Sequence, residues 1–382
     1  MAGDPDHRTL RVCHVAMGDL WAGAEVQLTA LVDALVKRPG LELSIVLLNE
    51  GRLASELRRL GVPVTVFPET KQNGLTLVRE LTVYCRARKF DLLHTHKYKD
   101  TILGTIAAAR CGIPSVVRTV HGLSEPFRGI RSFRMGLYEL CDDVAIRKKV
   151  DRLIAVSSQI EQVLSHRYGA KKVVQIHNGI RISQTQRIRV PQETRQQLGI
   201  DPSHHIIGTV GRLTAVKGHE HFLAGAQRLL QHRRDLRFVI VGDGPLLNHL
   251  KEKATDLGIA GHVTFLGHRD DTYDLIGAMD VFVLPSLHEG IPMVILEAMA
   301  LARPIVASRV GGIPEVITDF VHGLLIPAAD PRDLAAGCGK FLDDRNLAER
   351  CGLAGRRRVE QNFSAEAMGA KVAALYRELV LR

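Results

Sequence analysis

The sequence predicts two doubly wound α/β domains in one chain. Short apolar runs alternate with segments of helical periodicity, which is typical of a parallel sheet covered by helices on both faces. The alternation stops at a polar stretch near the middle of the chain and then starts again. The chain has 382 residues, and one hydrophobic core seldom extends over so many.

The first half is expected to form one such domain, residues 1–185. Each apolar run is followed by apolar residues at helical spacing. The expected strands are 10–16, 44–48, 62–67, 91–94, 115–120, 152–156 and 173–176. The expected helices are 26–37, 53–60, 75–88, 101–110, 130–149 and 159–167. Residues 181–192 are polar and show no periodicity, so we predict that they form the linker.

The second half repeats the alternation, and residues 190–364 are expected to form the second domain. Its strands are predicted at 206–210, 237–241, 263–266, 281–284, 305–307 and 323–325. Helices are expected between them and then at 330–343, 347–362 and 365–380. Ligands of such sheets bind at the carboxyl ends of the strands, so the loops that follow strands are where function is expected.

Composition restricts the class of protein and its partners. A net charge of +10 points to an anionic partner: a nucleotide, a nucleic acid, an acidic glycan or an anionic lipid surface. The six cysteines, at 13, 85, 111, 141, 338 and 351, lack metal-ligand spacing and predict reduced, buried thiols of a cytosolic protein. We find neither a signal peptide nor an apolar run of about 18 residues, so we predict a cytoplasmic protein whose membrane contact, if any, is peripheral.

The junction after the strand 281–284 is the most informative segment. The strand ends at Pro285, and a helix is expected from Met293. Free amide N–H groups and the helix dipole make such a junction a site for an anion such as a diphosphate. Glu289 and Glu297 flank the junction, and carboxylates accept hydrogen bonds from hydroxyl groups. A phosphate site beside two hydroxyl acceptors suggests a nucleotide sugar.

A second basic loop follows the first strand of the second half. In Gly211–Gly218, the cations Arg212 and Lys217 precede an expected helix. A guanidinium and an ammonium group there would hold a diphosphate and stabilise it as a leaving group. A solvated basic turn is the alternative interpretation.

These motifs resemble those of glycosyltransferase family 4, the retaining transferases with a GT-B fold. The junction matches that family's E-x7-E segment, and Gly211–Gly218 matches its G-R-L-x3-K-G segment. The resemblance implies two Rossmann-like domains facing across a cleft, with the final helix, 365–382, crossing back to the first domain. It also implies transfer of a hexosyl group from a nucleoside diphosphate sugar with retention of anomeric configuration. A UDP-sugar is favoured and a GDP-sugar comes next; the acceptor is a glycan, a lipid-linked sugar or a small molecule.

The resemblance also assigns roles in the second domain. Glu289 would contact the donor sugar, Glu297 the ribose, and Arg212 with Lys217 the leaving diphosphate. The remaining donor-site residues carried over by the resemblance are Gly290, Ile291, Met293, Val294, Gly242 of the turn 241–245, and the backbone of His268, which would meet the base.

Matches in the first domain are fewer. Gly23, where the first strand passes to the first helix, would approach the donor phosphates, although Ala22 stands where the family usually has glycine. His121, followed by Gly122, would contact the transferred sugar or the acceptor. The expected catalytic residues are therefore Glu289, His121, Arg212 and Lys217.

Other polar groups carry weaker expectations. His94 and His96 could bind a metal, but no third ligand is evident, and we interpret them as a polar rim that meets the acceptor. No D-x-D motif stands at a strand end, which predicts that no metal or other cofactor is required. Seven basic residues between 128 and 152 form either a solvated face or a contact with an anionic lipid surface or an acidic acceptor, and no nucleic-acid module is present.

Two other functional hypotheses remain at the level of sequence. One is a related GT-B enzyme, either a sugar-nucleotide epimerase, which needs no acceptor, or a phosphorylase, for which no pyridoxal-phosphate lysine is indicated. The other is a non-catalytic polyanion-binding protein that uses the basic surplus. Its binding would fall steeply with salt and would survive replacement of Glu289 by Gln.

Overall fold

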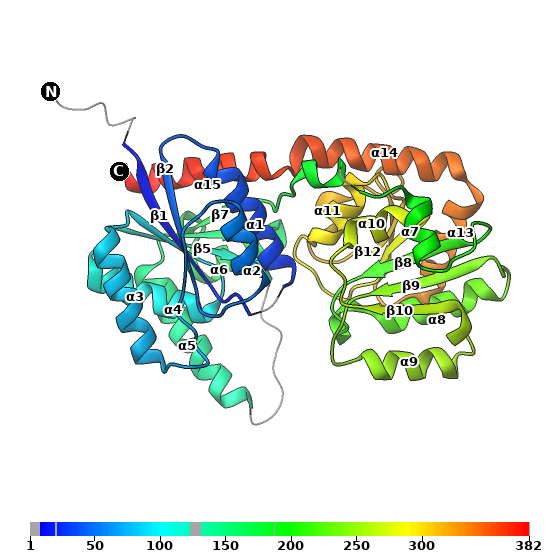
Figure 1. Ribbon diagram of the computed structural model, residues 1–382, viewed down its shortest axis with the longest axis horizontal. Coiled ribbons are helices and arrows are strands. Elements are labelled where there is room, and N and C mark those ends of the chain that lie inside the picture. Colours follow the sequence, from blue (N-terminus) through cyan, green and yellow to red (C-terminus); the bar gives the residue numbers. More distant parts are fainter. Residues whose placement is uncertain (1–7, 20, 123–130, 187, 382) are drawn as a thin grey trace. The chain divides into compact units, whose positions relative to one another are not determined.

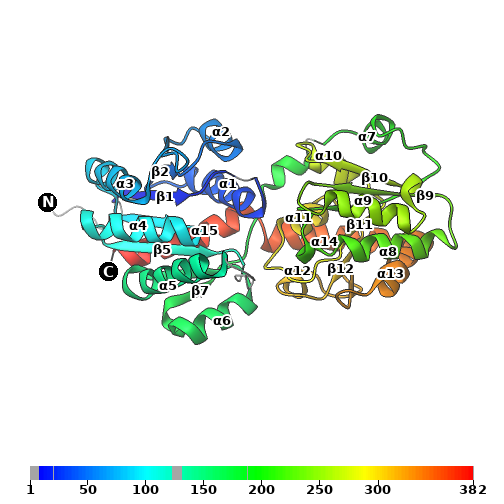
Figure 2. The same ribbon diagram turned by 90° about the horizontal axis from the view of Figure 1, so that it is seen from below.

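The computed structural model describes residues 8–19, 21–122, 131–186 and 188–381, without the side chains of residues 131–135. Its contacts divide the chain into two units (Figures 1 and 2). The first unit comprises Met1–Gly179 and Ala365–Arg382, and the second comprises Ile180–Ser364. The C-terminal helix therefore belongs to the same unit as the first strand.

The first unit contains a seven-stranded sheet in the order β3-β2-β1-β4-β5-β6-β7, and all of its strand pairs are parallel. Its strands are β1 (Leu10–Ala16), β2 (Leu41–Leu47), β3 (Val64–Val66), β4 (Leu92–Thr95), β5 (Ser115–Val120), β6 (Arg152–Ala155) and β7 (Val173–Gln175). Its helices are α1 (Gly23–Val36), α2 (Arg52–Arg59), α3 (Gly74–Arg88), α4 (Tyr98–Cys111), α5 (Arg131–Lys149), α6 (Ser158–Tyr168) and α15 (Ala365–Val380).

Helices cover both faces of this sheet. Apolar side chains of α1, α2 and α15 pack on one face, and those of α3, α4, α5 and α6 pack on the other. Helix α15 lies beside α1 (Figure 2). The order of strands changes direction between β1 and β4, which makes that point the topological switch where ligands of doubly wound sheets bind.

The second unit contains a six-stranded sheet in the order β10-β9-β8-β11-β12-β13, again with parallel pairs. The strands are β8 (His205–Val210), β9 (Leu236–Val241), β10 (Val263–Gly267), β11 (Val281–Leu284), β12 (Ile305–Ser308) and β13 (Leu324–Ile326). The helices are α7 (Pro191–Gln197), α8 (His219–Leu230), α9 (Leu247–Asp256), α10 (Thr272–Ala278), α11 (Met293–Ala300), α12 (Ile313–Val316), α13 (Pro331–Asp343) and α14 (Arg345–Asn362). Helices α8, α9 and α13 pack on one face of this sheet, and its switch point lies between β8 and β11.

The structure corrects three local expectations. The predicted linker, 181–192, is not irregular throughout: a 3-10 helix spans Ile182–Gln186, and α7 begins at Pro191, a residue that suits the first helical turn. Helix α4 begins at Tyr98 because the Asp100 carboxylate accepts hydrogen bonds from the amides of His96 and Lys97. Cys141 is exposed and Cys111 half-buried, whereas the other four cysteines are buried; all six are free thiols.

Candidate functional site

The loops that follow β8 and β11 form the candidate site of the second unit. These strands are neighbours at the switch point, so Gly211–Gly218 and Pro285–Gly290 emerge side by side. The amide of Leu287 donates to the carbonyl of Val216 across 2.7 Å and ties the loops together. The two segments that the sequence singled out are therefore in contact, although about 70 residues separate them.

Two glycines allow the backbones of this site to come so close. Gly218 has a φ of +66°, and a Cβ there would lie 2.0 Å from the carbonyl oxygen of Pro285. Gly242 has a φ of +133°, and its Cβ would lie 2.0 Å from the carbonyl oxygen of Gly211. Only glycine combines such dihedral angles with such contacts. Gly242 thus shapes the loop that carries Arg212.

Lys217 and Glu289 form an ion pair in this site. The ammonium Nζ of Lys217 lies 2.5 Å from Oε1 of Glu289, and the hydroxyl of Ser286 donates to the same oxygen across 2.7 Å. The Glu289 side chain is only 9% exposed. Glu289 is therefore an oriented carboxylate, held by a cation at one of its oxygens.

Arg212 differs from Lys217 in lacking an acidic partner. Its side chain is exposed, and within the described residues no carboxylate pairs with it. Helix α11 begins at Met293, and the first amides of a helix, here those of Met293 and Val294, have no carbonyl partner inside it. Gly290 and Ile291 belong to the loop that leads into this helix. A free guanidinium, a paired ammonium and helix-start amides together suit an anionic ligand.

Glu297 lies on the second turn of α11 and is buried, with 7% exposure. Burial raises its pKa from 4.5 to about 7. Within the described part of the chain, no side-chain or backbone group donates a hydrogen bond to its carboxylate. Burial raises the pKa of the nearby Tyr273 phenol, and the charge of Glu297 adds to this effect. A buried acceptor without a donor suits a ligand that brings hydroxyl groups.

Two further residues predicted to contact the donor, His268 and Gly23, are exposed. His268 follows β10, and its imidazole is exposed, so only its backbone could serve the role expected for it. Gly23 is the first residue of α1 in the other unit and is exposed. Its neighbour Ala22 is the N-cap, and the Ala22 amide donates to the Glu25 carboxylate across 3.1 Å, which itself pairs with Lys97 at 2.7 Å.

In the first unit, His121 directly follows β5, and its side chain is partly exposed. Nδ1 of His96 and Nε2 of His121 are 3.4 Å apart. The expectation that His94 and His96 form a polar rim is wrong, because both are buried, at 0% and 5% exposure. They lie beneath His121 because the alternation of side chains along β4 turns both toward the face covered by α15.

Sequence reasoning missed two groups near these sites. His14 completes a cluster of three buried histidines with His94 and His96; it comes from β1, and only strand pairing reveals it. His219 starts α8 next to the Lys217 loop, and both of its ring nitrogens are buried without a hydrogen bond within the described residues. Burial, with the nearby charge of Lys217, lowers the pKa of His219 to about 4.

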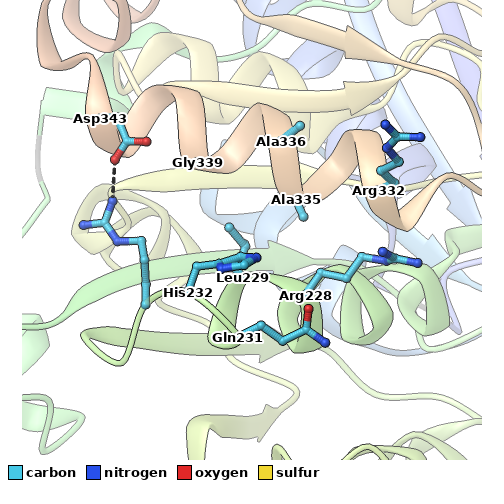
Figure 3. Close-up of a pocket in the computed structure, with 10 residues that line it drawn as sticks. Arg228, Leu229, Gln231, His232, Arg332, Ala335, Ala336, Gly339 and Asp343 are labelled. Carbon is cyan, nitrogen blue, oxygen red and sulfur yellow. Dashed lines mark hydrogen bonds and ion pairs between the residues drawn. The ribbon is translucent and has the colours of Figure 1, made fainter.

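A basic groove of about 520 Å³ lies elsewhere on the second unit, between α8 and α13 (Figure 3). Leu229, Ala335 and Ala336 line it together with the cations Arg228 and Arg332. Arg233, another lining residue, forms an ion pair with Asp343 at 2.8 Å. No loop that follows a strand lines this groove. It is therefore separate from the candidate site.

The predicted basic run is only partly described. Arg128 lies outside the described residues, as do the side chains of Arg131 and Arg134. Arg147 pairs with Asp143 at 2.7 Å, whereas Lys148 and Lys149 are exposed at the end of α5.

Comparison with known proteins identifies the family. The family model "Glycosyl transferases group 1" matches residues 190–358, and "Glycosyltransferase Family 4" matches residues 21–184. An alpha-maltose-1-phosphate synthase of Mycobacterium tuberculosis is 30% identical over 332 residues, which cover 80% of this chain and 83% of the relative. The chain belongs to the group 1 glycosyltransferases. It is similar over 98% of both lengths, at 28% identity, to the UDP-Gal:alpha-D-GlcNAc-diphosphoundecaprenol alpha-1,3-galactosyltransferase of Escherichia coli.

Solved structures agree with this glycosyltransferase in fold. Anabaena HepE in complex with UDP-glucose superposes with a TM-score of 0.85 at 22% identity, covering 97% of this chain and all of HepE. The expected fold class, two parallel-sheet Rossmann-like domains of the GT-B type, is confirmed. So are the expected family and enzyme class, a hexosyltransferase that uses a nucleotide sugar. The hypothesis of a non-catalytic polyanion-binding protein is thereby set aside. No helix within the described ranges is long and apolar enough to cross a membrane.

Proposed function

We propose that this glycosyltransferase transfers a hexosyl group from a UDP-sugar, with retention of configuration, to a lipid-linked glycan. The observation that carries the donor half is the ion pair of Lys217 and Glu289 at the β8–β11 switch point, beside the free guanidinium of Arg212 and the start of α11. Two cations and a helix start suit a diphosphate, and the oriented carboxylate suits the hydroxyls of a sugar.

In this proposal each residue of the site binds a different part of the nucleotide sugar. Arg212 and Lys217 take the charge that develops on the diphosphate when its bond to the anomeric carbon breaks. The phosphates also lie beside the backbone of the loop and helix start formed by Gly290, Ile291, Met293 and Val294. Glu289 orients the sugar, because its second oxygen remains available while Lys217 and Ser286 hold Oε1. Since side-chain cations provide the neutralising charge, we propose that catalysis requires no metal.

The nucleoside half of the donor rests on Glu297 and the loop after β10. Glu297 accepts from the ribose hydroxyls, and the backbone at His268 meets the base. Uridine is favoured because the similar galactosyltransferase of Escherichia coli carries UDP-Gal in its name and HepE was solved with UDP-glucose. Retention of configuration is supported by the match of Glu289 and Glu297 to the E-x7-E segment.

The proposal of a lipid-linked acceptor is supported by the first unit and by the galactosyltransferase of Escherichia coli, which this chain matches over nearly its whole length. That relative acts on a diphosphoundecaprenol-linked sugar, a substrate that resides at a membrane. Helix α5 exposes Leu137, Tyr138, Leu140 and Val144 and ends in exposed lysines. Apolar side chains beside cations suit peripheral contact with an anionic membrane. We therefore propose that α5 brings the enzyme to the membrane surface that holds its acceptor.

Donor binding is tested first by titrating UDP, GDP and ADP into the protein by calorimetry, with and without a chelator. UDP should bind in both conditions, and loss of binding with the chelator would contradict metal independence. The UDP-sugars are then offered with α-D-GlcNAc-diphosphoprenol, and NMR of the product gives its anomeric configuration. Steady turnover to an α-linked product supports the proposal, whereas a β-linked product would overturn retention.

Membrane contact has its own measurement. Flotation with vesicles of anionic or zwitterionic lipid should recover the enzyme only with the anionic ones. Replacing Leu137 and Leu140 by Ser should abolish recovery while UDP affinity stays unchanged. Replacing Val83 of α3 and Leu353 of α14 by Ser is the matched control, because both are exposed apolar residues of other helices; recovery should stay intact. Equal recovery of all three proteins would contradict a role for α5.

A further inference from the structure

Alternate residues of three neighbouring strands bring a row of polar side chains to one face of the first sheet. On β1 the row contains His14, on β4 His94 followed by His96 just beyond the strand, and on β5 Thr119 followed by His121. His14 and His94 are register partners. Toward the amino ends of these strands the same face carries apolar core residues. The polar row therefore lies between that core and the carboxyl edge of the sheet, at the switch point, where α15 covers it with Tyr376.

These groups form one unbranched chain of hydrogen bonds. The Oγ1 of Thr119 is 2.8 Å from Nε2 of His94, and Nδ1 of His94 is 2.5 Å from the hydroxyl of Tyr376. The same hydroxyl is 3.3 Å from Nε2 of His14. Nδ1 of His14 is 3.2 Å from Nε2 of His96, and Nδ1 of His96 is 3.4 Å from Nε2 of His121. Each interior histidine contacts the next member through its second ring nitrogen, whereas Tyr376 makes both of its contacts through its one hydroxyl.

The geometry favours hydrogen bonds over a metal held by the three buried histidines. The rings of His14 and His96 are within 16° of parallel, and their centres are 5.5 Å apart although the facing nitrogens are 3.2 Å apart. The rings thus meet edge to edge, each nitrogen aimed at the other. The same holds for His96 and His121, with centres 5.6 Å apart. A shared metal would need the lone pairs to converge on a third point about 2 Å from each nitrogen.

The four histidines of this hydrogen-bond chain are neutral. Burial lowers the pKa of His14 and of His121 to about 3 and holds that of His94 and His96 well below the usual range. Neighbouring imidazoles, together with Lys97 and Arg118, add to this effect. A neutral imidazole has one N–H donor and one acceptor nitrogen. Each ring must therefore receive a hydrogen bond on one side and donate on the other, so the whole chain runs in one direction.

Thr119 fixes that direction. Its hydroxyl is buried, at 1% exposure, and within the described residues its partner is His94. If Thr119 only accepted, its own hydrogen would be buried without an acceptor, which costs about 1–3 kcal/mol. If it donates, every later member donates in turn: His94 to Tyr376, Tyr376 to His14, His14 to His96, and His96 to His121. His121 then accepts at Nε2 and carries its proton on Nδ1.

We propose that this chain holds His121 as the Nδ1–H tautomer, so that it donates a hydrogen bond to a substrate oxygen and does not act as a base. Tyr376, His14 and His96 are positioning residues in this view, and the ligand is a hydroxyl or phosphate oxygen of the donor or acceptor. The inference rests on the proposed function for the identity of the substrate, but not for the tautomer. It extends the site to the C-terminal helix, since Tyr376 links two strands of the sheet.

The tautomers can be read directly by long-range proton–nitrogen NMR of protein labelled with 15N-histidine. His14, His94, His96 and His121 should all show the Nδ1–H pattern at neutral pH, although free histidine prefers Nε2–H. Single His→Asn variants assign the signals. An Nε2–H pattern at His121 in the wild-type protein overturns the proposal, whether or not any transferase activity has been found. Addition of Zn²⁺ should leave the four patterns unchanged; their conversion to metal-bound signals would also overturn it.

Tyr376→Phe breaks the chain by removing one hydroxyl. His121 should then show a mixture of tautomers, and kcat should fall by about tenfold, the equivalent of one hydrogen bond, while the Kd for UDP stays unchanged. Tyr84→Phe is the matched control, because the buried Tyr84 hydroxyl of the same unit has no hydrogen-bond partner in the described part of the chain; neither quantity should change. A tautomer at His121 that Tyr376→Phe does not disturb would refute the chain. Correct tautomers without turnover of any nucleotide sugar would instead count against the proposed function.

Discussion

Replacing Glu289 by Gln should tighten the binding of free UDP and at the same time abolish transfer. Glu289 neutralises Lys217 across 2.5 Å. A diphosphate that forms an ion pair with Lys217 must displace or share this contact, and the negative charge of Glu289 repels it. Glutamine keeps the size of the side chain and one oxygen but removes that charge. The substitution thus separates phosphate binding from sugar orientation.

The magnitude follows from Coulomb's law. Two unit charges 4 Å apart interact by about 4 kcal/mol at an effective dielectric constant of 20, and by about 2 kcal/mol at twice that distance. The Lys217 side chain is 25% exposed, so solvent screens part of this repulsion. We expect UDP to bind about 3- to 30-fold more tightly, which corresponds to roughly 0.7–2 kcal/mol. Loss of an oriented contact to the sugar should lower kcat by about 100-fold or more.

Calorimetric titration with UDP and a coupled assay of UDP release measure the two effects. Glu252→Gln is the matched control, because it removes the same charge from an exposed position on α9, and both quantities should stay at the wild-type value. Weaker or unchanged UDP binding in Glu289→Gln would show that the diphosphate does not lie beside this carboxylate. Retained turnover would remove Glu289 from the catalytic residues.

Three further predictions concern the second unit. Gly218→Ala should lower the free energy of unfolding by about 2–4 kcal/mol in urea titration, because the new Cβ meets the Pro285 carbonyl at 2.0 Å; an unchanged midpoint would contradict the close approach. Burial raises the pKa of Glu297 from its ordinary value of 4.5 to about 7 in the folded protein. The stability that its protonated form contributes is therefore complete below pH 4.5 and is lost as the pH rises through 7. Glu297→Gln should therefore gain about 3 kcal/mol over the wild type at pH 8 but not at pH 4.5, and weaken UDP binding; parallel pH profiles of the two proteins would refute this. His219→Leu should raise the urea midpoint, corresponding to about 1 kcal/mol, because both ring nitrogens are buried and neither has a hydrogen-bond partner among the described residues; a lower midpoint would contradict this.

Local sequence was sufficient to place the strands and to single out the two loops of the candidate site in the second unit, but not to find α7, which begins in the predicted linker. Apolar runs bounded by Gly and Pro place every strand to within a few residues, because strand formation in a parallel sheet depends on continuous apolar burial. The loop Gly211–Gly218 and the junction at Glu289 could be singled out because anion binding at a helix start leaves a local pattern of Gly, cations and Pro. That these segments touch follows only from the pairing of β8 with β11.

The histidine chain shows what sequence could not determine. His94 and His96 are polar residues after a strand, which locally suggests an exposed rim, and nothing near them indicates burial. Their surroundings depend on β1, which supplies His14, and on α15, which supplies Tyr376 from 282 positions beyond His94. Strand register and the return of the last helix to the first sheet are tertiary events, decided by the packing of whole apolar faces. The sequence by itself therefore determined the strands and singled out the two loops that we propose bind phosphate, and only the tertiary structure decided which buried polar groups become partners.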